Sequence, residues 1–479
     1  MFAPRYKIPA KMPRTARDQN GIHRPSWMNT TSPAAIRSLC RAHLALGSCP
    51  PSGRLPSSVL VCAVLLEPYG AGRGAVVRAG SGSNAGNRRV WSTPGTIRVM
   101  NQAAAEQAGD GAVTLFLCGD VMLGRGVDQI LPHPGDPTLR ERSVHDARTY
   151  VALAARVNGS IPQPVDWSWP WGDALELLAQ VDCDARIINL ETSITTSSDF
   201  DLGKGVHYRM HPANVPAVGI VRPDVCVLAN NHVLDFGRRG LLETLDVLAA
   251  SRTPVAGAGR SLDAAEAPAF VPIPRSGGRV VVFAFGTPSG GIPHGWAAAV
   301  NEPGVNLIAS LTDVAADELC RRAEEVRQPG DIVVVSAHWG TNWGYEVEAD
   351  QVRFAHRLID GGVDVVHGHS SHHPLPIEVY SGKLILYGCG DLIDDYEGIT
   401  GHERYRDDLR LLYFPRLDPA SGQLKELRLA PLQARQLRLH RASEHDAEWL
   451  RTVLDDVSRP FRSRIGRSSD GFLTLAIAP

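Results

Sequence analysis

The 479-residue sequence lacks the patterns that mark several common classes of protein. Its eight cysteines form no C-x-x-C pair, so neither a zinc ribbon nor a disulfide framework is indicated, and this usage fits a reducing compartment. A long hydrophobic run is also missing. The apolar stretch at 57–70 is too short to span a bilayer and lies too deep in the chain for a signal peptide, so no transmembrane segment is predicted.

Acidic residues are nearly absent from the first hundred positions, which hold 14 Lys and Arg against 2 Asp and Glu, leaving 35 against 49 for the rest. This part is rich in Pro, Gly, Ser and Arg and buries too little apolar surface to offset the ordering of its backbone. We therefore expect 1–110 to be a disordered basic tail. It could be a nucleic-acid arm, a targeting peptide, or translated upstream sequence with the working start at Met100. We favour the last and expect no nucleic-acid partner, because the tail lacks dense basic runs with interleaved aromatics.

From residue 111 onward, short runs rich in β-branched residues alternate with amphipathic segments. This alternation predicts an α/β fold in which helices cover sheets. Thr312 is predicted to cap a helix that closes at Pro329 and Gly330, and Ser443 to cap a helix near the end of the chain. We expect one domain over 111–440, with a helix and strand at 441–479 packed on it.

Several of the apolar runs end in a residue that can bind a metal, at the position where α/β proteins gather reactive side chains. The four that precede the histidine cluster end in Asp120, in Glu191, in Asn231 with His232, and in His338. A single Asp or His after a strand is more often a cap or a satisfied polar group, but the recurrence in one chain favours a shared site.

A fifth run leads into "VVHGHSSHHPLPIEVY", which holds His367, His369, His372 and His373 within seven positions. Imidazole is the commonest protein metal ligand and titrates nearest neutral pH, so the cluster indicates a metal or proton-transfer site. An exposed histidine-rich loop without function is the alternative.

Together these residues make a mixed oxygen and nitrogen ligand list, which suits Mn, Fe or Zn. Two such ions could clamp the oxygens of a transferring phosphoryl group. His232, beside a ligand, could protonate a leaving oxygen as a general acid. Arg125 and Asn230 are predicted to contact an anionic substrate, Arg125 through its planar guanidinium. Asp235 is expected to orient the loop around His232 or to cap the helix that follows.

The segments "GDVMLGR", "NLETSIT", "LANNHVLDFG", "AHWG" and "DVVHGHSSHHPLPIEVYSGKLILYGCGD", in this order and spacing, resemble the CapA family of poly-γ-glutamate capsule synthesis proteins. That family resembles the calcineurin-like metallophosphoesterases. The likeness covers about residues 112 to 415. It implies a four-layer α/β sandwich of mixed sheets flanked by helices, holding two divalent metal ions.

The resemblance also implies a role for each matching residue. Asp120 corresponds to a first metal ligand, Glu191 to a bridging carboxylate, and Asn231 to the ligand of the Asn-His pair. His232 corresponds to its catalytic partner. The remaining metal ligands implied by position are His338, His369 and His372.

The chain departs from the family's pattern in two places. Two serines separate His369 from His372, which leaves His367 and His373 as spare imidazoles. Asp391 stands where many members have Asn. An extra carboxylate near the site could bind a cation or change substrate choice, but we favour a role as the cap of a strand end.

The leading hypothesis is a metal-dependent phosphoesterase-type hydrolase linked to poly-γ-glutamate or a related anionic polymer, with an anionic or phosphorylated substrate. The alternative is an accessory protein that binds polymer or other polymer-synthesis proteins and keeps the metal site without turnover. The absence of a clear signal favours a cytoplasmic location, whereas the family resemblance favours the cell envelope.

Overall fold

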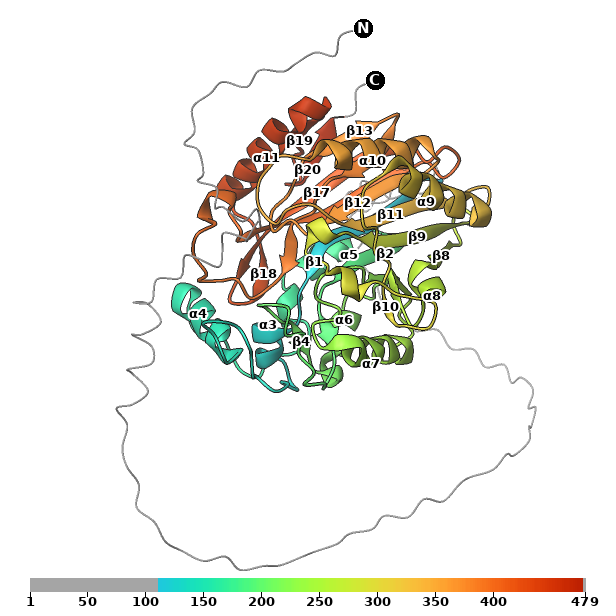
Figure 1. Ribbon diagram of the computed structural model, residues 1–479. Coiled ribbons are helices and arrows are strands. Elements are labelled where there is room, and N and C mark those ends of the chain that lie inside the picture. The colour runs from blue at the N-terminus through green and yellow to red at the C-terminus, as the bar shows by residue number, and fades with distance from the viewer. Residues whose placement is uncertain (1–110, 477–479) are drawn as a thin grey trace, which may run out of the picture. The chain divides into compact units, whose positions relative to one another are not determined.

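The computed structural model describes residues 111–476 (Figure 1). The expected disordered tail at 1–110 lies outside the described residues, as do positions 477–479.

The first of two large sheets has ten strands and mixes parallel with antiparallel pairs. In order across the sheet they are β19 (Arg464–Arg467), β20 (Leu473–Ala476), β17 (Leu424–Arg435), β16 (Leu409–Leu417), β1 (Val113–Val121), β2 (Ala185–Leu190), β5 (Val225–Val227) and β6 (Val255–Ala256), with β15 (Asp391–Ile393) beside β1 and β18 (Arg438–Arg441) beside β17. The neighbouring strands β1, β2, β5 and β6 are parallel to one another. On the other side of β1, the strands β16, β17, β20 and β19 continue the sheet in antiparallel pairs.

The second large sheet has six strands. They are β13 (Ile377–Tyr380), β14 (Lys383–Leu386), β12 (Val365–His369), β11 (Ile332–His338), β9 (Gly278–Gly286) and β8 (Ala269–Ile273). The four central strands are parallel and the two edge strands antiparallel. Two short pairs complete the strands: β3 (Ser193–Ile194) with β4 (Arg209–Met210), and β7 (Ala258–Gly259) with β10 (Gly304–Val305).

The helices lie outside the two sheets. They are α3 (Arg125–Ile130), α4 (Arg148–Asn158), α5 (Ala174–Gln180), α6 (Pro216–Gly219), α7 (Gly237–Ala250), α8 (Leu262–Glu266), α9 (Asp313–Val326), α10 (Ala349–Asp360) and α11 (Glu444–Ser458). Among the described residues, no helix combines the length and apolar character that crossing a membrane requires.

The side chains of β9 and β11 show how the layers stack. Val281, Phe283 and Phe285 pack with α9 and α10 in one apolar cluster, whereas the alternate residues Val280 and Val282 pack toward the first sheet in another. Alternation along a strand sends neighbouring side chains to opposite faces, so the second sheet is buried on both sides. Figure 1 shows α9 and α10 beside β9, β11 and β12. The predicted class, a sandwich of mixed sheets flanked by helices, is confirmed.

Two predicted helix starts are also confirmed. The hydroxyl of Thr312 accepts a hydrogen bond from the amide of Ala315 at the start of α9, and Ser443 does the same for Asp446 at the start of α11. Each side chain satisfies an amide that has no partner within the first turn.

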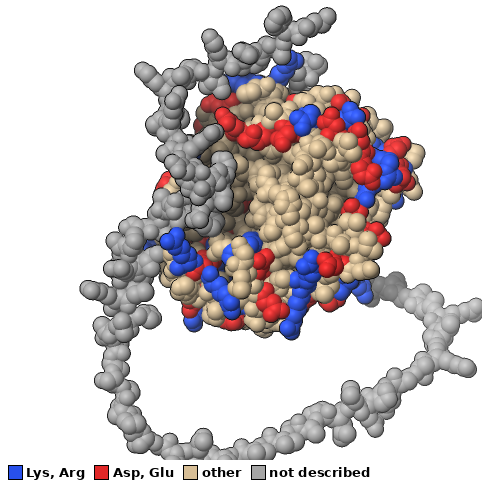
Figure 2. Space-filling model, viewed as in Figure 1, with Lys and Arg blue, Asp and Glu red and all other residues tan. Residues whose placement is uncertain are grey.

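Acidic and basic side chains alternate around the rim of the face in Figure 2, and the middle of this face is largely free of both. Charges of one sign therefore do not gather there into the basic stripe that typifies a nucleic-acid interface.

Candidate metal centre

Strands from both large sheets end at one place, and their register decides which side chains meet there. Asp120 on β1 is paired with Asn189 on β2 and with Asp391 on β15. In the second sheet, His338 on β11 is paired with His369 on β12. The carboxyl ends of parallel strands lie at the same edge of a sheet, which brings Asp120, Asn189, His338 and His369 together, and β15 begins beside them with Asp391.

A close backbone approach brings β1 and β15 together. A Cβ atom at Gly119 would collide with the carbonyl of Gly390, so only glycine fits at 119. The amide of Asp120 donates a hydrogen bond to that same carbonyl at 3.1 Å. The glycine therefore allows the carboxylates of Asp120 and Asp391 to face the same space.

Asp120 belongs to two groups of potential metal ligands. The first group is Asp120, His338 and His369, and the second is Asp120, His372 and Asp391. Within each group the candidate ligand atoms all lie within 4.8 Å of one another, and every member is buried. The residues predicted as ligands at 120, 338, 369 and 372 are thus brought together, with Asp120 as the carboxylate common to both groups.

Glu191, predicted as the bridging carboxylate, lies beside these groups and is in neither of them. Its Oε2 is 3.7 Å from Nδ1 of His338. The side-chain amide of Asn189 donates to Asp120 at 2.7 Å and to Glu191 at 3.0 Å, so it holds the two acids at fixed positions. Asn189 was missed in the sequence, where its only signal is the place two residues before Glu191.

For Asp391 the structure favours the first of the roles considered from the sequence, the binding of a cation. A strand-end cap was the favoured role, but its Oδ1 lies 2.9 Å from Nδ1 of His372 and it belongs to the second ligand group. Burial favours the neutral ring, yet the carboxylates of Asp391, Asp120 and Asp394 together outweigh it and raise the pKa of His372. Nε2 of the same ring lies 2.8 Å from the amide of Asn342.

The electrostatics of the site favour a cation. Burial raises the pKa of Glu191 to about 8, and the charge of Asp391 adds to that rise. Burial likewise raises the pKa of Asp120, with Glu191 and Asp391 as further causes. Against the effect of burial, His372 lowers the pKa of Asp391. Asp120 and Glu191 are therefore the buried acids whose ionised forms are costly without a compensating positive charge.

The donor set fits a divalent metal ion. Buried carboxylates and imidazoles are the mixed oxygen and nitrogen ligands that Mn, Fe and Zn accept. In addition, Oδ1 of Asn231 is buried and has no hydrogen-bond partner among the described residues. An amide oxygen without a hydrogen-bond partner keeps its lone pairs available for a metal ion, as the ligand role predicted for Asn231 would need.

The ring of His232 is held by a contact through Nδ1, while its Nε2 faces Glu191. Its Nδ1 lies 2.6 Å from Oδ2 of Asp235, and its Nε2 lies 3.9 Å from Oε1 of Glu191. Lys204 donates to the other oxygen of Asp235 at 2.6 Å. Burial lowers the pKa of His232 to about 4, against the opposing charge of Asp235. Of the two roles expected for Asp235, it orients the loop around His232. It does not cap the helix that follows, because α7 begins without a side-chain cap.

The two residues predicted to contact substrate are engaged inside the fold. The guanidinium of Arg125 donates to Asp395 at 2.8 Å and to Glu141 at 3.0 Å, and only 4% of the residue is exposed. The side-chain amide of Asn230 donates to Asn189 at 3.0 Å and to the carbonyl of Leu190 at 2.9 Å. Arg125 thus joins the segment after β15 to Glu141, and Asn230 joins its loop to the end of β2.

The two spare imidazoles differ in their surroundings. Nε2 of His367, on β12, lies 2.8 Å from the carbonyl oxygen of Cys118, and burial lowers the pKa of the ring to about 4. His373 lies outside both ligand groups, with its Nδ1 3.2 Å from the carbonyl of Pro374. The cluster is thus not an exposed loop, because all four imidazoles are buried.

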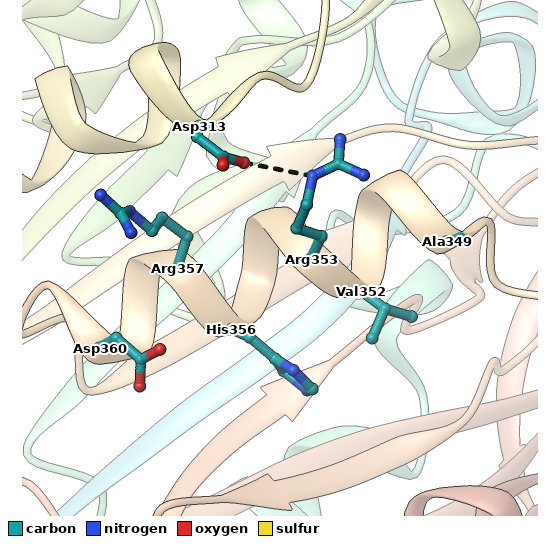
Figure 3. A pocket seen from close by; sticks show the side chains of 7 residues that line it. All are labelled: Asp313, Ala349, Val352, Arg353, His356, Arg357 and Asp360. Carbon is teal, nitrogen blue, oxygen red and sulfur yellow. Dashed lines mark hydrogen bonds and ion pairs between the residues drawn. The ribbon is translucent and has the colours of Figure 1, made fainter. Parts of the chain in front are cut away.

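A separate pocket lies on the outer face of α10, away from these residues (Figure 3). Its charged side chains pair with acids of α9, as Arg353 does with Asp313 and Arg357 with Asp317. It presents no group of ligand atoms like those around Asp120.

Comparisons with known proteins agree with the family resemblance. The profile of the bacterial capsule synthesis protein family PGA_cap matches residues 114–396, a range that contains both ligand groups. A protein of Mycobacterium tuberculosis (strain ATCC 25618 / H37Rv) named "Probable polyglutamine synthesis accessory protein" is 54% identical over 368 residues, which cover 76% of this chain and 96% of that protein. The PGA biosynthesis protein CapA of Bacillus subtilis is 26% identical over 309 residues, covering 64% of this chain and 68% of CapA. Among solved structures, a 5'-nucleotidase precursor from Thermus thermophilus is 14% identical with a TM-score of 0.38, covering 73% of this chain and 59% of that chain.

Proposed function

This chain belongs to the bacterial capsule synthesis protein family PGA_cap, and from that premise we propose that it is a metal-dependent hydrolase of phosphate esters. The proposed reaction serves the synthesis of a poly-γ-glutamate capsule or a related anionic polymer. The observation that carries the proposal is the position of Asp120, whose carboxylate is common to two groups of buried ligand atoms. A carboxylate common to both groups would let two neighbouring cations share one negative charge.

The residues of the first ligand group would hold one divalent ion and those of the second group another, with Mn, Fe or Zn suited to these donors. When bound, such ions supply Lewis-acid polarisation of a phosphoryl oxygen and lower the pKa of a water molecule. Glu191, whose Oε2 lies 3.7 Å from Nδ1 of His338, would be a further ligand, and the amide oxygen of Asn231, which has no hydrogen-bond partner among the described residues, is the candidate predicted at 231.

His232 is proposed to move the proton of the reaction. A carboxylate only accepts, so the proton on Nδ1 is directed to Asp235, and Nε2 of the neutral ring carries a lone pair. This nitrogen faces the side of Glu191 and the ligand groups. It can take up a proton there and deliver it to a leaving oxygen, while Asp235 stabilises the charged ring.

A second function, binding without turnover, is supported by a different observation. The relative that is 54% identical carries the name of a synthesis accessory protein. An accessory protein of this kind would bind the anionic polymer or other synthesis proteins and use the metal ions for structure.

One experiment separates the two functions. The metal-stripped full chain is loaded in turn with Mn²⁺, Zn²⁺ or Fe²⁺, and its metal content and its hydrolysis of aryl phosphate mono- and diesters are measured. The proposed hydrolase binds metal and turns over at least one ester class, and Asp120→Asn loses both properties. Asp331→Asn is the matched control, because Asp331 is equally buried but pairs with Arg279 at the far end of β11. Stoichiometric metal with no hydrolysis of either class supports the accessory function instead.

A further inference from the structure

His367 lies two residues before the ligand His369 and belongs to neither ligand group. We propose that His367 and Ser336 are positioning residues that set the tautomer of His369, so that its Nδ1 carries the lone pair directed at the metal site. The inference rests on the proposed metal site for its purpose, but the hydrogen-bond chain that supports it exists in the protein alone.

The chain begins at a group that can only accept. The carbonyl oxygen of Cys118 on β1 lies 2.8 Å from Nε2 of His367. A carbonyl has no hydrogen to give, so Nε2 of His367 must carry one. Both polar partners of this fully buried ring, a carbonyl and a hydroxyl, are uncharged, and nothing among them holds a second proton on the imidazole. The ring is neutral, and its Nδ1 is an acceptor.

Ser336 connects the tautomer of His367 to the tautomer of the next imidazole, His369. Its hydroxyl lies 3.0 Å from Nδ1 of His367 and 3.0 Å from Nε2 of His369. A hydroxyl has a single hydrogen, and the bare Nδ1 of His367 takes it. Toward His369 the oxygen of Ser336 can then only accept, so Nε2 of His369 carries the hydrogen of that contact.

The opposite nitrogen of His369 is left without a hydrogen. This Nδ1 lies 3.9 Å from Oδ1 of Asp120 and 2.8 Å from Nδ1 of His338. With Nδ1 of His369 bare, the hydrogen between the two rings belongs to His338 in the metal-free protein. The ring of His369 is thereby prepared to bind a cation before any cation arrives.

The relay spans both large sheets, because Cys118 belongs to β1 and the other three residues to β11 and β12. Ser336 and His367 are fully buried and directly paired in register. A buried polar chain in which every member is satisfied fixes the orientation of each ring. This is the relation that typical metal sites show between a ligand histidine and the group that accepts its other ring hydrogen.

The first test needs no metal. The full chain is prepared with ¹⁵N-labelled histidine and stripped of metal, and a long-range ¹H–¹⁵N spectrum identifies the hydrogen-bearing nitrogen of each neutral ring. The signals of His369 are assigned by their loss in His369→Gln. The expected result is a hydrogen on Nε2 of His369 and on Nε2 of His367. A hydrogen on Nδ1 of His369 overturns the proposal.

The second test measures the affinity for Zn²⁺ by competition with a chelator. Ser336→Ala and His367→Phe each remove one step of the relay and should weaken Zn²⁺ binding about 10- to 100-fold, with unchanged stoichiometry at saturation. In both variants the tautomer preference of His369 should weaken in the same spectrum. Affinities within twofold of the unmodified protein in both variants overturn the proposal.

His356→Gln is the matched control, because this partly buried histidine pairs with Glu378 through Nε2 and lies on α10 at the outer pocket (Figure 3). It should leave Zn²⁺ affinity unchanged. If His367→Phe does not fold, the smaller change Ser336→Ala decides. An unmodified protein that binds no Zn²⁺ contradicts the proposed function, and the spectrum of the metal-free chain still decides the relay.

Discussion

Asp120 and Asp391 are register partners on the parallel strands β1 and β15, and both belong to the ligand group that contains His372. Their backbones approach so closely that the carbonyl of Gly390 occupies the space a side chain at Gly119 would need. The pair places two buried carboxylates around one imidazole. This arrangement gives the second ligand group one more negative charge than an Asn at position 391 would.

Asp391→Asn should weaken the binding of one metal ion and spare the other. The change removes a ligand charge from the second group and takes the ionic partner from His372, whereas the first group keeps all its donors. We expect the affinity for one ion to fall by about 100-fold or more. Metal titration followed by elemental analysis measures it, with Asp331→Asn as the control. Loss of both ions together would contradict a division into two groups.

His232→Gln should depress hydrolysis by about 100-fold or more while the bound metal stays unchanged, because a proton-transfer residue affects the rate and not the ligand set. Asp235→Asn should also slow the reaction, since an amide does not stabilise the charged ring as a carboxylate does. His211→Gln, a change at a half-buried histidine outside the site, is the control. Equal loss of metal in the His232 and Asp120 variants would show that His232 is a ligand.

Metal should stabilise the fold, because it neutralises Asp120 and Glu191, whose ionised forms are destabilised by burial and by neighbouring carboxylates. Free metal at 100 times its dissociation constant should add ~2.7 kcal/mol to the free energy of unfolding. Thermal melts with and without a chelator measure this gain. Asp120→Asn should show no gain on adding metal and should melt close to the unmodified protein in chelator, since it removes one of the repelling charges. A variant that still gains stability from metal would contradict the assignment of Asp120.

Asp455 should make the attachment of α11 depend on pH in the acid range. Hydrogen bonds from Arg464, at 2.8 Å, and from the amide of Ile465, at 2.9 Å, hold the pKa of this carboxyl well below its usual range. The folded-state pKa is depressed, so the stabilisation is complete above the unfolded value of about 4 and is lost as the pH falls through the folded value.

Asp455→Asn should cost about 2 kcal/mol at neutral pH and flatten the acid limb of the stability profile. Asp456→Asn is the matched control, because the adjacent carboxylate is 57% exposed and pairs with Arg459 at the surface. Urea unfolding at a series of pH values measures both. An acid limb that stays as steep in the Asp455 variant would contradict the assignment.

Local patterns were sufficient for much of this protein. Runs of β-branched residues predicted strands such as β9 and β11, and the hydroxyls of Thr312 and Ser443 predicted two helix starts. Strand periodicity and capping depend on residues within a few positions of one another, so the sequence states them directly. Each metal-competent residue directly follows its own strand in the sequence, and the recurrence of this local pattern indicated a shared site.

Only the tertiary structure decided which partners each side chain contacts and which carboxylate the two ligand groups share. Whether Asp120 or Glu191 is the shared carboxylate depends on the register between β1, β2 and β15, which joins residues up to 272 positions apart. The burial of Arg125 against Asp395, and the placing of His367 between Cys118 and Ser336, depend equally on contacts between distant segments. A hydrogen bond forms only between atoms that packing brings within about 3 Å. The residue types were therefore legible in the sequence, and their partners were set by the meeting of the two sheets.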